Sequence, residues 1–270
     1  MLQNIWKVAM NRTVIIDGDV IVYKVAEAIA DSFDISTTED DEFIYRNIGW
    51  ASKSEAVKFT DEMISKICED CKANKVCICL SDMNANFRKR INPNYKSNRK
   101  AIKPILYEFL RNYLLNSGYQ VYERPELEAD DVIGILATSS KIIQGDKVVW
   151  SLDKDFKTIP CKFHRASIKG EDTSKVITET EADWWFLYQT LVGDTVDGYS
   201  GCKGVGDKTA RKILGEVGEH SLAEMWKAVV EAYEKYGFSE KEALLNARMA
   251  RILRAEDYDF KNKEVKLWQI

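Results

Sequence analysis

The sequence predicts an α/β fold, in which a central parallel sheet is flanked by helices and followed by a helical C-terminal region. Short apolar runs alternate with helical patterns through residues 1–180, which is typical of a parallel sheet with crossover helices. From Glu181 onward only helical patterns remain. A chain of 270 residues, 45% of them hydrophobic, can form one large domain or two small ones. We expect residues 1–180 and 181–270 to form two regions of different architecture within one body.

The predicted strands are short apolar runs broken by acidic residues and glycine, as expected for buried parallel strands. They lie at residues 13–16, 76–80, 119–122 and 147–152. Apolar residues at helical spacing, together with capping residues, predict the helices. These lie at residues 20–30, 53–73, 104–116, 132–139, 181–191 and 208–214, and two more begin at the capping boxes Ser221–Glu224 and Ser239–Glu242. We expect residues 31–50, which are acidic, to form an irregular surface loop.

Composition excludes several classes of protein. The formal charge is −4, 30% of residues are charged, and no apolar run approaches the roughly 18 residues of a membrane span. No secretion signal is visible at the N-terminus, so we expect a cytoplasmic protein without a membrane partner. Cys68-x-x-Cys71 and Cys77-x-Cys79 could be drawn as a zinc site, but the second pair alternates with apolar residues and favours buried thiols.

Acidic residues follow most of the predicted strands. Because ligands of open α/β sheets bind beyond the carboxyl ends of the strands, we expect these side chains to converge on one edge. So many like charges would repel one another unless cations neutralise them, and oxygen ligands without His or Cys favour Mg²⁺ or Mn²⁺. Any single acid among 43 could still be ordinary surface, Asp19 and Asp197 most readily. The candidates are Asp17, Asp19, Asp82, Glu128, Asp130, Asp131, Asp153, Asp155, Asp194 and Asp197.

A basic stretch stands out in this acidic chain. Residues 88–103 contain seven basic residues and no Asp or Glu, which favours phosphate binding over a solvated helix face. Lys96 and Arg99 are three residues apart, so we expect them to share a helix face and reach a phosphate whose negative charge grows during the reaction. Tyr95 could stack on a base. The remaining candidates for nucleic-acid contact here are Arg88, Lys89, Arg90, Lys100 and Lys103.

A glycine-rich segment at residues 201–209 nearly spells a phosphate-binding loop of nucleotide hydrolases. Asp207 stands before Lys208, however, and no apolar strand precedes the segment. We favour a tight helix–hairpin–helix turn whose backbone N–H groups bind a DNA phosphate. Its candidate residues are Lys203, Gly204, Gly206 and Lys208, with Arg211 and Lys212 nearby.

These motifs together resemble the 5′→3′ exonuclease/flap endonuclease family, which includes the nuclease domain of bacterial DNA polymerase I. They are IIDGD, YKSNR, EADD, DKD and GDTVDGYSGCKGVGDKTA. Longer stretches such as NPNYKSNRKA, LDKDFKTIP and ADWWFLYQTLVGDTVDGYSG are more similar still to the exonucleases of short-tailed phages. The resemblance covers nearly the whole chain.

The resemblance implies a PIN-like nuclease domain with a basic helical arch at residues 83–103 and a helix-3-turn-helix region that binds DNA. It implies two Mg²⁺ ions, replaceable by Mn²⁺, and K⁺ at the turn containing Gly204 and Gly206. Lys96 and Arg99 would contact the scissile phosphate, and Asp19 would lie behind the ligands. One ion would be bound by Asp17, Asp82, Glu128 and Asp130, and the other by Asp153, Asp155 and Asp194, with Asp131 and Asp197 assisting.

The resemblance also implies substrates and partners. These are duplex DNA with 5′ ends, nicks or flaps, and RNA–DNA hybrids, with a replication polymerase or single-strand binding protein as further partners. Primer removal and degradation of host DNA in the host cytoplasm would follow for a phage protein. Two alternatives stay open: a protein that binds branched DNA without cutting it, and an RNA-directed nuclease with the same sheet.

Overall fold

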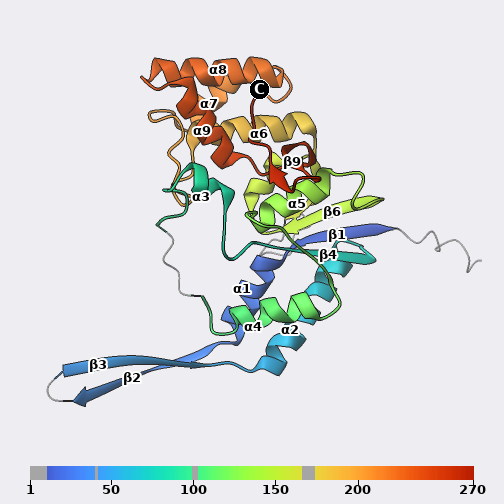
Figure 1. The fold of residues 1–270 in the computed structure, drawn as a ribbon, viewed down its shortest axis with the longest axis vertical. Coiled ribbons are helices and arrows are strands. Elements are labelled where there is room, and N and C mark those ends of the chain that lie inside the picture. The colour runs from blue at the N-terminus through green and yellow to red at the C-terminus, as the bar shows by residue number, and fades with distance from the viewer. Residues whose placement is uncertain (1–10, 40–41, 99–102, 166–173) are drawn as a thin grey trace, which may run out of the picture.

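A six-stranded sheet lies at the centre of the computed structural model, which describes residues 11–39, 42–98, 103–165 and 174–270 (Figure 1). Its order is β5-β4-β1-β6-β7-β8, and every neighbouring pair is parallel except β7 and β8. The strands are β1 (Arg12–Asp17), β4 (Lys75–Leu80), β5 (Gln120–Glu123), β6 (Asp146–Ser151), β7 (Cys161–Arg165) and β8 (Ser174–Ile177).

Helices bury both faces of this sheet, which explains why its central strands are apolar throughout. Side chains alternate between the faces: Val14 and Ile16 of β1 face one apolar cluster, while Ile15 faces another. The first cluster packs against α1 (Gly18–Ile29), α2 (Lys53–Asp70) and α4 (Tyr107–Asn116). The second packs against α5 (Ala129–Thr138), the short helix η1 (Lys154–Thr158) and residues 252–258, which include η2 (Ala255–Asp257).

The helices that follow the sheet form a further apolar cluster at one end of the molecule (Figure 1). They are α6 (Glu179–Val192), α7 (Asp207–Leu214), α8 (Leu222–Lys235) and α9 (Glu240–Ala250). Tyr95 from the basic stretch and Trp268 from the C-terminal tail also belong to this cluster. After α9 the chain returns to the sheet and forms the short pair β9 (Tyr258–Asp259) and β10 (Glu264–Val265). The domain division near residue 180 stays a prediction.

The four strands and the helices predicted from apolar patterns are present, and both capping boxes form. Strands β7 and β8 were not predicted. The irregular loop expected at residues 31–50 is wrong, because an antiparallel hairpin of β2 (Asp31–Glu39) and β3 (Glu42–Trp50) stands there and extends away from the body (Figure 1). The prediction relied on the acidic residues of this segment. It overlooked Phe33, Ile35 and Thr37, which recur at every second position, a pattern typical of a strand.

The basic stretch contains the short helix α3 (Phe87–Ile91), followed by turns to Asn98. Lys96 lies in one of these turns with a φ of 51°, so the helix face that we expected it to share with Arg99 does not form at Lys96. Arg99 and Lys100 lie outside the described residues. Asn92 and Pro93 follow α3 directly, and a residue before proline is biased away from the α-helical region.

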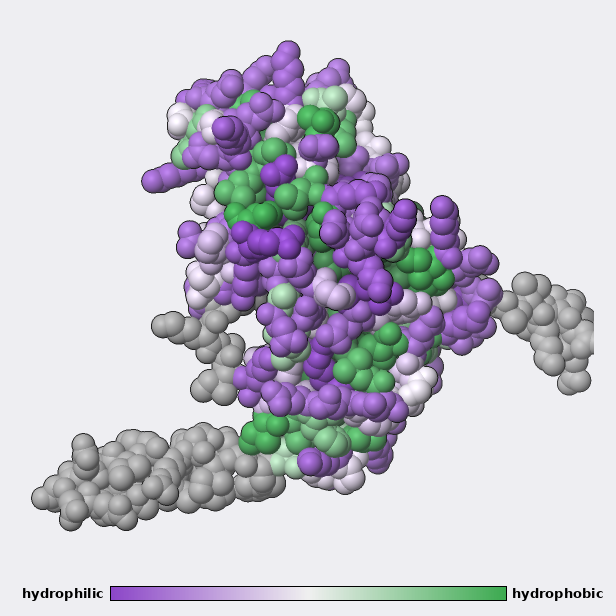
Figure 2. Space-filling view, viewed as in Figure 1, coloured by the Kyte–Doolittle hydropathy of each residue, from purple (hydrophilic) through white to green (hydrophobic). Residues whose placement is uncertain are grey.

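The face of the molecule seen in Figure 2 is largely hydrophilic, and its apolar patches are separated by polar side chains. Among the described residues, no helix combines the length and the apolar character that crossing a membrane requires.

Candidate active site

A cavity of about 520 Å³ opens beyond the carboxyl ends of β1 and β6. Its walls contain eight carboxylates that come from four separate parts of the sequence. Three cationic side chains, Arg88, Lys96 and Lys154, also line it. The sheet therefore gathers acids that are far apart in the chain, as the strand ends predict. The carboxylates are Asp17, Asp19, Glu128, Asp130, Asp153, Asp155, Asp194 and Asp197.

Asp17 stands where β1 ends and α1 begins. Its Oδ1 accepts a hydrogen bond of 3.2 Å from Val20 N, which caps the helix, and its Oδ2 accepts one of 3.3 Å from the Ser151 hydroxyl at the end of β6. Asp19, in the first turn of α1, accepts from Ser81 N at 3.1 Å. Parallel strand pairing thus places both carboxylates beside the ends of β4 and β6.

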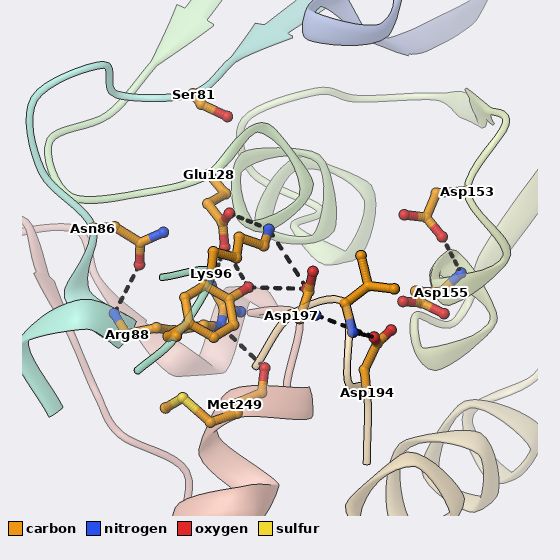
Figure 3. Close-up of polar contacts among 12 residues, drawn as sticks. Ser81, Asn86, Arg88, Lys96, Glu128, Asp153, Asp155, Asp194, Asp197 and Met249 are labelled. Carbon is orange, nitrogen blue, oxygen red and sulfur yellow. Dashed lines mark hydrogen bonds and ion pairs between the residues drawn. The ribbon is translucent and has the colours of Figure 1, made fainter. Parts of the chain in front are cut away.

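The other acids are held by tight local turns. Asp153 caps η1, with its Oδ1 accepting a hydrogen bond of 2.8 Å from Asp155 N. Oδ1 of Asp194 accepts from the backbone N–H groups of Val196 and Asp197, at 2.8 and 3.2 Å. Figure 3 shows Asp153 and Asp155 together, away from Glu128. Each turn uses one carboxylate oxygen of its capping residue and leaves the other available to a ligand.

Like charges in this cavity disturb the titration of its acids. Burial and the neighbouring charges of Asp19 and Asp153 raise the pKa of Asp17 to about 7. Burial and Asp153 likewise raise the pKa of Asp155 to about 7. Asp130, buried beside Asp17 and Asp153, has a pKa well above its ordinary value. The cavity therefore carries negative charge that a bound cation would relieve.

Lys96 supplies part of that positive charge from the protein itself. Its Nζ lies 2.5 Å from Glu128 Oε1 and 3.5 Å from Asp197 Oδ2 (Figure 3). Burial alone would raise the pKa of Glu128, but the charges of Lys96 and Arg88 outweigh it and lower this pKa to about 2. Glu128 is therefore a carboxylate at any pH near neutrality.

Comparisons with known proteins agree with this geometry. A family model described as the 5′-3′ exonuclease N-terminal resolvase-like domain matches residues 12–182. The exonuclease of Escherichia phage T7 is 37% identical over 217 residues, which cover 68% of this chain and 70% of the phage protein. The chain belongs to the 5′–3′ exonuclease family. It is accordingly a nuclease that acts on phosphodiester bonds.

More distant relatives of this exonuclease extend the match. DNA polymerase I of Caldicellulosiruptor bescii is 30% identical over 211 residues, which cover 71% of this chain and 24% of the polymerase. A solved structure of the bacteriophage T5 flap endonuclease, a pseudo-enzyme–product complex with DNA and metal ions, superposes with a TM-score of 0.62 at 15% identity. That match covers 89% of each chain and shows a shared fold, which confirms the predicted fold class.

Asp82 is a predicted ligand that does not line the cavity. Its Oδ1 accepts from Asn84 N at 2.9 Å and its Oδ2 from Glu126 N at 2.8 Å, so both oxygens hold the loop after β4. Burial would raise the pKa of Asp82, but these backbone hydrogen bonds prevail and lower it. Asp19, which we expected behind the ligands, faces the cavity instead.

Asp131 and Arg88 also have other roles than those predicted. Both carboxylate oxygens of Asp131, which is 0% exposed, accept hydrogen bonds of 2.7 Å from the Arg88 guanidinium, and Oδ1 also accepts from Leu253 N. Arg88 is 2% exposed and additionally donates to the carbonyl oxygens of Met249 and Arg251. This pair ties α3, α5 and the C-terminal segment together, with Arg88 lining the cavity and Asp131 buried behind it.

Tyr95 is 3% exposed, and its hydroxyl donates to Glu128 Oε2 at 2.8 Å. A buried ring has no free face for a base, so the predicted stacking role does not fit this conformation. Lys89, Arg90 and Lys103 are exposed, and Arg90 pairs with Glu126. The basic stretch therefore divides into buried residues that shape the site and exposed residues that remain candidates for phosphate contact.

The predicted tight turn after α6 is present. Val205 N donates to Cys202 O at 2.9 Å, and Gly206 is the N-terminal cap of α7. Gly204 has a φ of 98°, and a Cβ there would lie 2.9 Å from the Tyr236 ring. Lys203 and Lys208 are exposed on either side of the turn. The element before this segment is the helix α6 and not a strand. A phosphate-binding loop of nucleotide hydrolases follows a strand, so the structure agrees with the interpretation that this segment is a different kind of turn.

Arg111 is a site residue that the motifs missed. From the buried face of α4, its guanidinium lies 3.5 Å from Asp19 and donates a 2.6 Å hydrogen bond to Ser81 O. The charge of Arg111 therefore offsets that of Asp19 without facing the cavity. The signal was present in the sequence, because Arg111 falls on the same helix face as Tyr107, Leu110 and Leu114, where a charge needs a buried partner.

Within the described parts of the chain, no group of three or more His, Cys, Asp or Glu side chains is already arranged to hold a metal ion. The acids share one cavity without forming a finished ligand shell. Lys96 meanwhile occupies the space between Glu128 and Asp197. Ion binding would therefore require the carboxylates to close around the ion.

Proposed function

We propose that this exonuclease is a Mg²⁺-dependent 5′→3′ nuclease that hydrolyses duplex DNA at 5′ ends, nicks and flaps, and the RNA of RNA–DNA hybrids. It leaves 5′-phosphates. Primer removal and degradation of host DNA during phage replication fit this activity, with a replication polymerase or single-strand binding protein as partners. The similarity to the phage T7 exonuclease and to polymerase I supports the proposal.

The observation that carries the proposal is the cavity with eight carboxylates. Oxygen donors without His or Cys suit Mg²⁺ or Mn²⁺. The raised pKa values of Asp17 and Asp155 show that the negative charges of the neighbouring carboxylates are not fully neutralised within the protein. The T5 flap endonuclease, which shares the fold, is described with metal ions. Two ions bound among these acids would activate a water molecule and stabilise the leaving oxygen.

The protein's own residues divide into two proposed ligand groups. Asp82 and Asp131 belong to neither group. Both oxygens of Asp82 accept hydrogen bonds from backbone N–H groups, and both oxygens of Asp131 accept hydrogen bonds from Arg88. Asp197 assists from the loop after α6. The first group is Asp17, Asp19, Glu128 and Asp130, and the second is Asp153, Asp155 and Asp194.

Lys96 is the proposed contact of the scissile phosphate. Its Nζ already lies inside the cavity, and its pairing with Glu128 and Asp197 can be exchanged for a phosphate oxygen when ions neutralise those acids. Burial would lower the pKa of Lys96, but Glu128 and Asp197 raise it, so the amine stays protonated. Arg99 is proposed as its neighbour on the basic stretch.

The turn after α6 is the proposed contact of the duplex. Lys203 and Lys208 flank backbone N–H groups that start α7, an arrangement that favours a DNA phosphate. K⁺ at the backbone of Gly204 and Gly206 is part of this proposal. The exposed Lys89, Arg90 and Lys103 would attract the strand, and Lys100, which lies outside the described residues, is proposed to act with them.

A cleavage assay tests the proposal. A 5′-labelled nicked duplex, a flap, an RNA–DNA hybrid and single-stranded RNA are incubated with Mg²⁺ or with EDTA, and the lengths and end groups of the products are measured. We expect Mg²⁺-dependent cutting of the first three. Asp153→Ala should abolish cutting while duplex affinity in EDTA stays within about threefold, and Asp70→Ala, at an exposed carboxylate outside the cavity, should leave both unchanged.

Binding without cutting in Mg²⁺ would instead favour the branched-DNA binding protein, and preferential cutting of single-stranded RNA would favour the RNA-directed nuclease. Full activity of Asp153→Ala would remove the cavity from the reaction.

A further inference from the structure

A second cavity, of about 250 Å³, adjoins the acidic one. The two share Lys154, Asp155, Gln189 and Asp194, so whatever enters the second cavity lies next to the acids. We call it the Trp185 groove, after the ring that forms one wall together with Tyr188 of α6. Lys157 of η1 lines it as well. Nothing in the proposed ligand groups or in the turn after α6 uses Trp185, Tyr188 or Lys157.

Aromatic rings hold cations at this groove. Nζ of Lys157 lies 4.5 Å from the centroid of the Trp185 ring. The Arg211 guanidinium of α7 lies 5.7 Å from the same ring and 5.3 Å from that of Tyr188. Tyr188 in turn stacks on Trp184 with centroids 5.4 Å apart. Cations over ring faces are attracted by the ring quadrupole, so contact with the rings helps to hold both long side chains in place.

Lys157 has no close acidic partner among the described residues, although Asp155 and Asp194 line the same groove. Within the ranges that the structure describes, no carboxylate oxygen lies within 4.0 Å of Lys157 Nζ. Lys154 lines the same groove, and the Arg211 guanidinium lies over the Trp185 ring. Arg211 has an acidic partner, Asp207 at 2.9 Å, but half of its side chain is exposed. An anion at the groove would relieve the repulsion among these cations.

We propose that the Trp185 groove binds a backbone phosphate of the nucleic acid strand, close to the bond that is cut. The inference rests on the proposed function, because it takes that strand as the source of the phosphate. Stacking of a base is disfavoured, since Lys157 and Arg211 already lie over the Trp185 and Tyr188 rings and Tyr188 is stacked on Trp184. Lys157 is the central contact, and Trp185 positions it.

The groove also explains how a strongly acidic cavity can accept a polyanion. A phosphate at Lys157 is held just outside the cluster that includes Asp155 and Asp194, so the neighbouring phosphate of the same strand is presented to the acids and their ions. A single phosphate contact of this kind is independent of sequence and sensitive to salt. It would add to the affinity contributed by the turn after α6.

DNA affinity in EDTA tests the groove without any cutting. Fluorescence anisotropy of a labelled nicked duplex is measured from 50 to 200 mM salt for the wild type, Lys157→Ala, Lys157→Arg and Lys162→Ala. Lys162 is the matched control, a half-exposed lysine of β7 that pairs with Asp146 and does not line the groove. We expect Lys157→Ala to weaken binding about five- to tenfold and to reduce the slope of log K against log salt by about 0.9, the value for one phosphate. Lys157→Arg should restore most of the affinity.

A phosphate-by-phosphate scan then places the contact. Single methylphosphonate linkages, which lack the negative charge, are introduced along the cut strand. One linkage should weaken wild-type binding and have no further effect on Lys157→Ala. Equal affinity and salt slope for wild type and Lys157→Ala, or an equal loss in Lys162→Ala, would overturn the proposal. So would binding of inorganic phosphate that depends on Lys157 while DNA affinity does not.

These outcomes are separable from failure of the proposed function. Lack of cutting in Mg²⁺ with the Lys157 effect intact would reject the nuclease mechanism and retain the phosphate contact. Cutting with no Lys157 effect would do the reverse.

Discussion

Asp19 and Asp82 show how neighbouring acids at one sheet edge acquire different tasks. Both lie within three residues of a strand end, on β1 and β4. Asp19 lies in the first turn of α1 and faces the cavity. Both oxygens of Asp82 instead accept hydrogen bonds from backbone N–H groups, those of Asn84 and Glu126. Asp19 also accepts hydrogen bonds, from Ser81 N and Arg111. Proximity to a strand end therefore selects candidates, and the local hydrogen bonds decide which of them face the cavity.

The first prediction concerns this pair. Asp19→Asn should lower the single-turnover cleavage rate about 10- to 100-fold, because a carboxylate at the proposed ion site is lost. Asp82→Asn should stay within about threefold of the wild type, since an amide oxygen still accepts a backbone hydrogen bond. The rates are compared at saturating Mg²⁺ on one nicked duplex. The reverse order of the two variants would return Asp82 to the ligands.

The second prediction concerns the buried charge of Asp17. The pKa of its carboxyl is about 7 in the folded protein against an ordinary 3.8, so the folded state prefers the protonated form. Without metal, Asp17 should therefore destabilise the protein increasingly from about pH 4 to pH 7, and fully above that. Asp17→Asn should raise the free energy of unfolding of the metal-free protein by about 2 kcal/mol at pH 8 and change it little at pH 4.

Urea denaturation in EDTA at the two pH values measures this difference. Asp70→Asn, at an exposed position, is the control and should show no such pH dependence. An Asp17→Asn protein that is less stable than wild type at pH 8 would mean that the carboxylate is already compensated inside the protein.

At the scale of elements, the turn that carries Lys96 is docked on the loop that carries Asp194 and Asp197. Lys96 N donates to Asp197 O at 2.9 Å, and the side chain of Asn98 donates to Thr195 O at 3.2 Å. Gly198 permits this approach, because a Cβ there would lie 2.5 Å from Asn94 O. The placement of Lys96 among the acids thus depends on backbone contact between two loops.

The third prediction tests that contact. Gly198→Ala should lower the single-turnover rate about tenfold or more by displacing the Lys96 turn. Gly118→Ala is the matched control: its φ of 87° resembles the 78° of Gly198, but a Cβ there meets nothing within 4 Å. Both variants carry the strain of a positive φ. A difference in their cleavage rates would therefore come from the steric clash at position 198, which displaces the Lys96 turn. Equal rates for the two would show that the docking of the turn does not matter for cleavage.

Some elements could be predicted from sequence and others could not. Strand ends followed by acids, as at Asp17 and Asp153, carry their own signal, and so do capping boxes such as Ser221 with Glu224, because local chemistry specifies both. The direction of the Asp82 side chain and the burial of Tyr95 depend on Glu126 and Glu128, which are more than 30 residues away. No local pattern contains that information.

At the scale of the whole molecule, the acidic cavity joins parts of the fold that have separate apolar cores. Asp17, Asp130 and Asp153 come from the sheet and the elements next to it, and Asp194 and Asp197 follow α6 of the helical region. The C-terminal tail connects these parts, as Arg254 pairs with Asp183 of α6 at 2.7 Å and Trp268 packs on Phe186. The geometry of the site therefore depends on the cohesion of the entire chain.

The central claim is that this cavity binds two divalent ions, and counting bound Mn²⁺ by electron paramagnetic resonance tests it most directly. Two Mn²⁺ ions per chain should bind to the wild type, with Mg²⁺ competing. Asp17→Asn combined with Asp130→Asn should lose one ion, Asp153→Asn combined with Asp155→Asn should lose the other, and Asp82→Asn should keep both. Failure of the wild type to bind Mn²⁺, or unchanged binding when Asp17, Asp130, Asp153 and Asp155 are all replaced, would contradict the account.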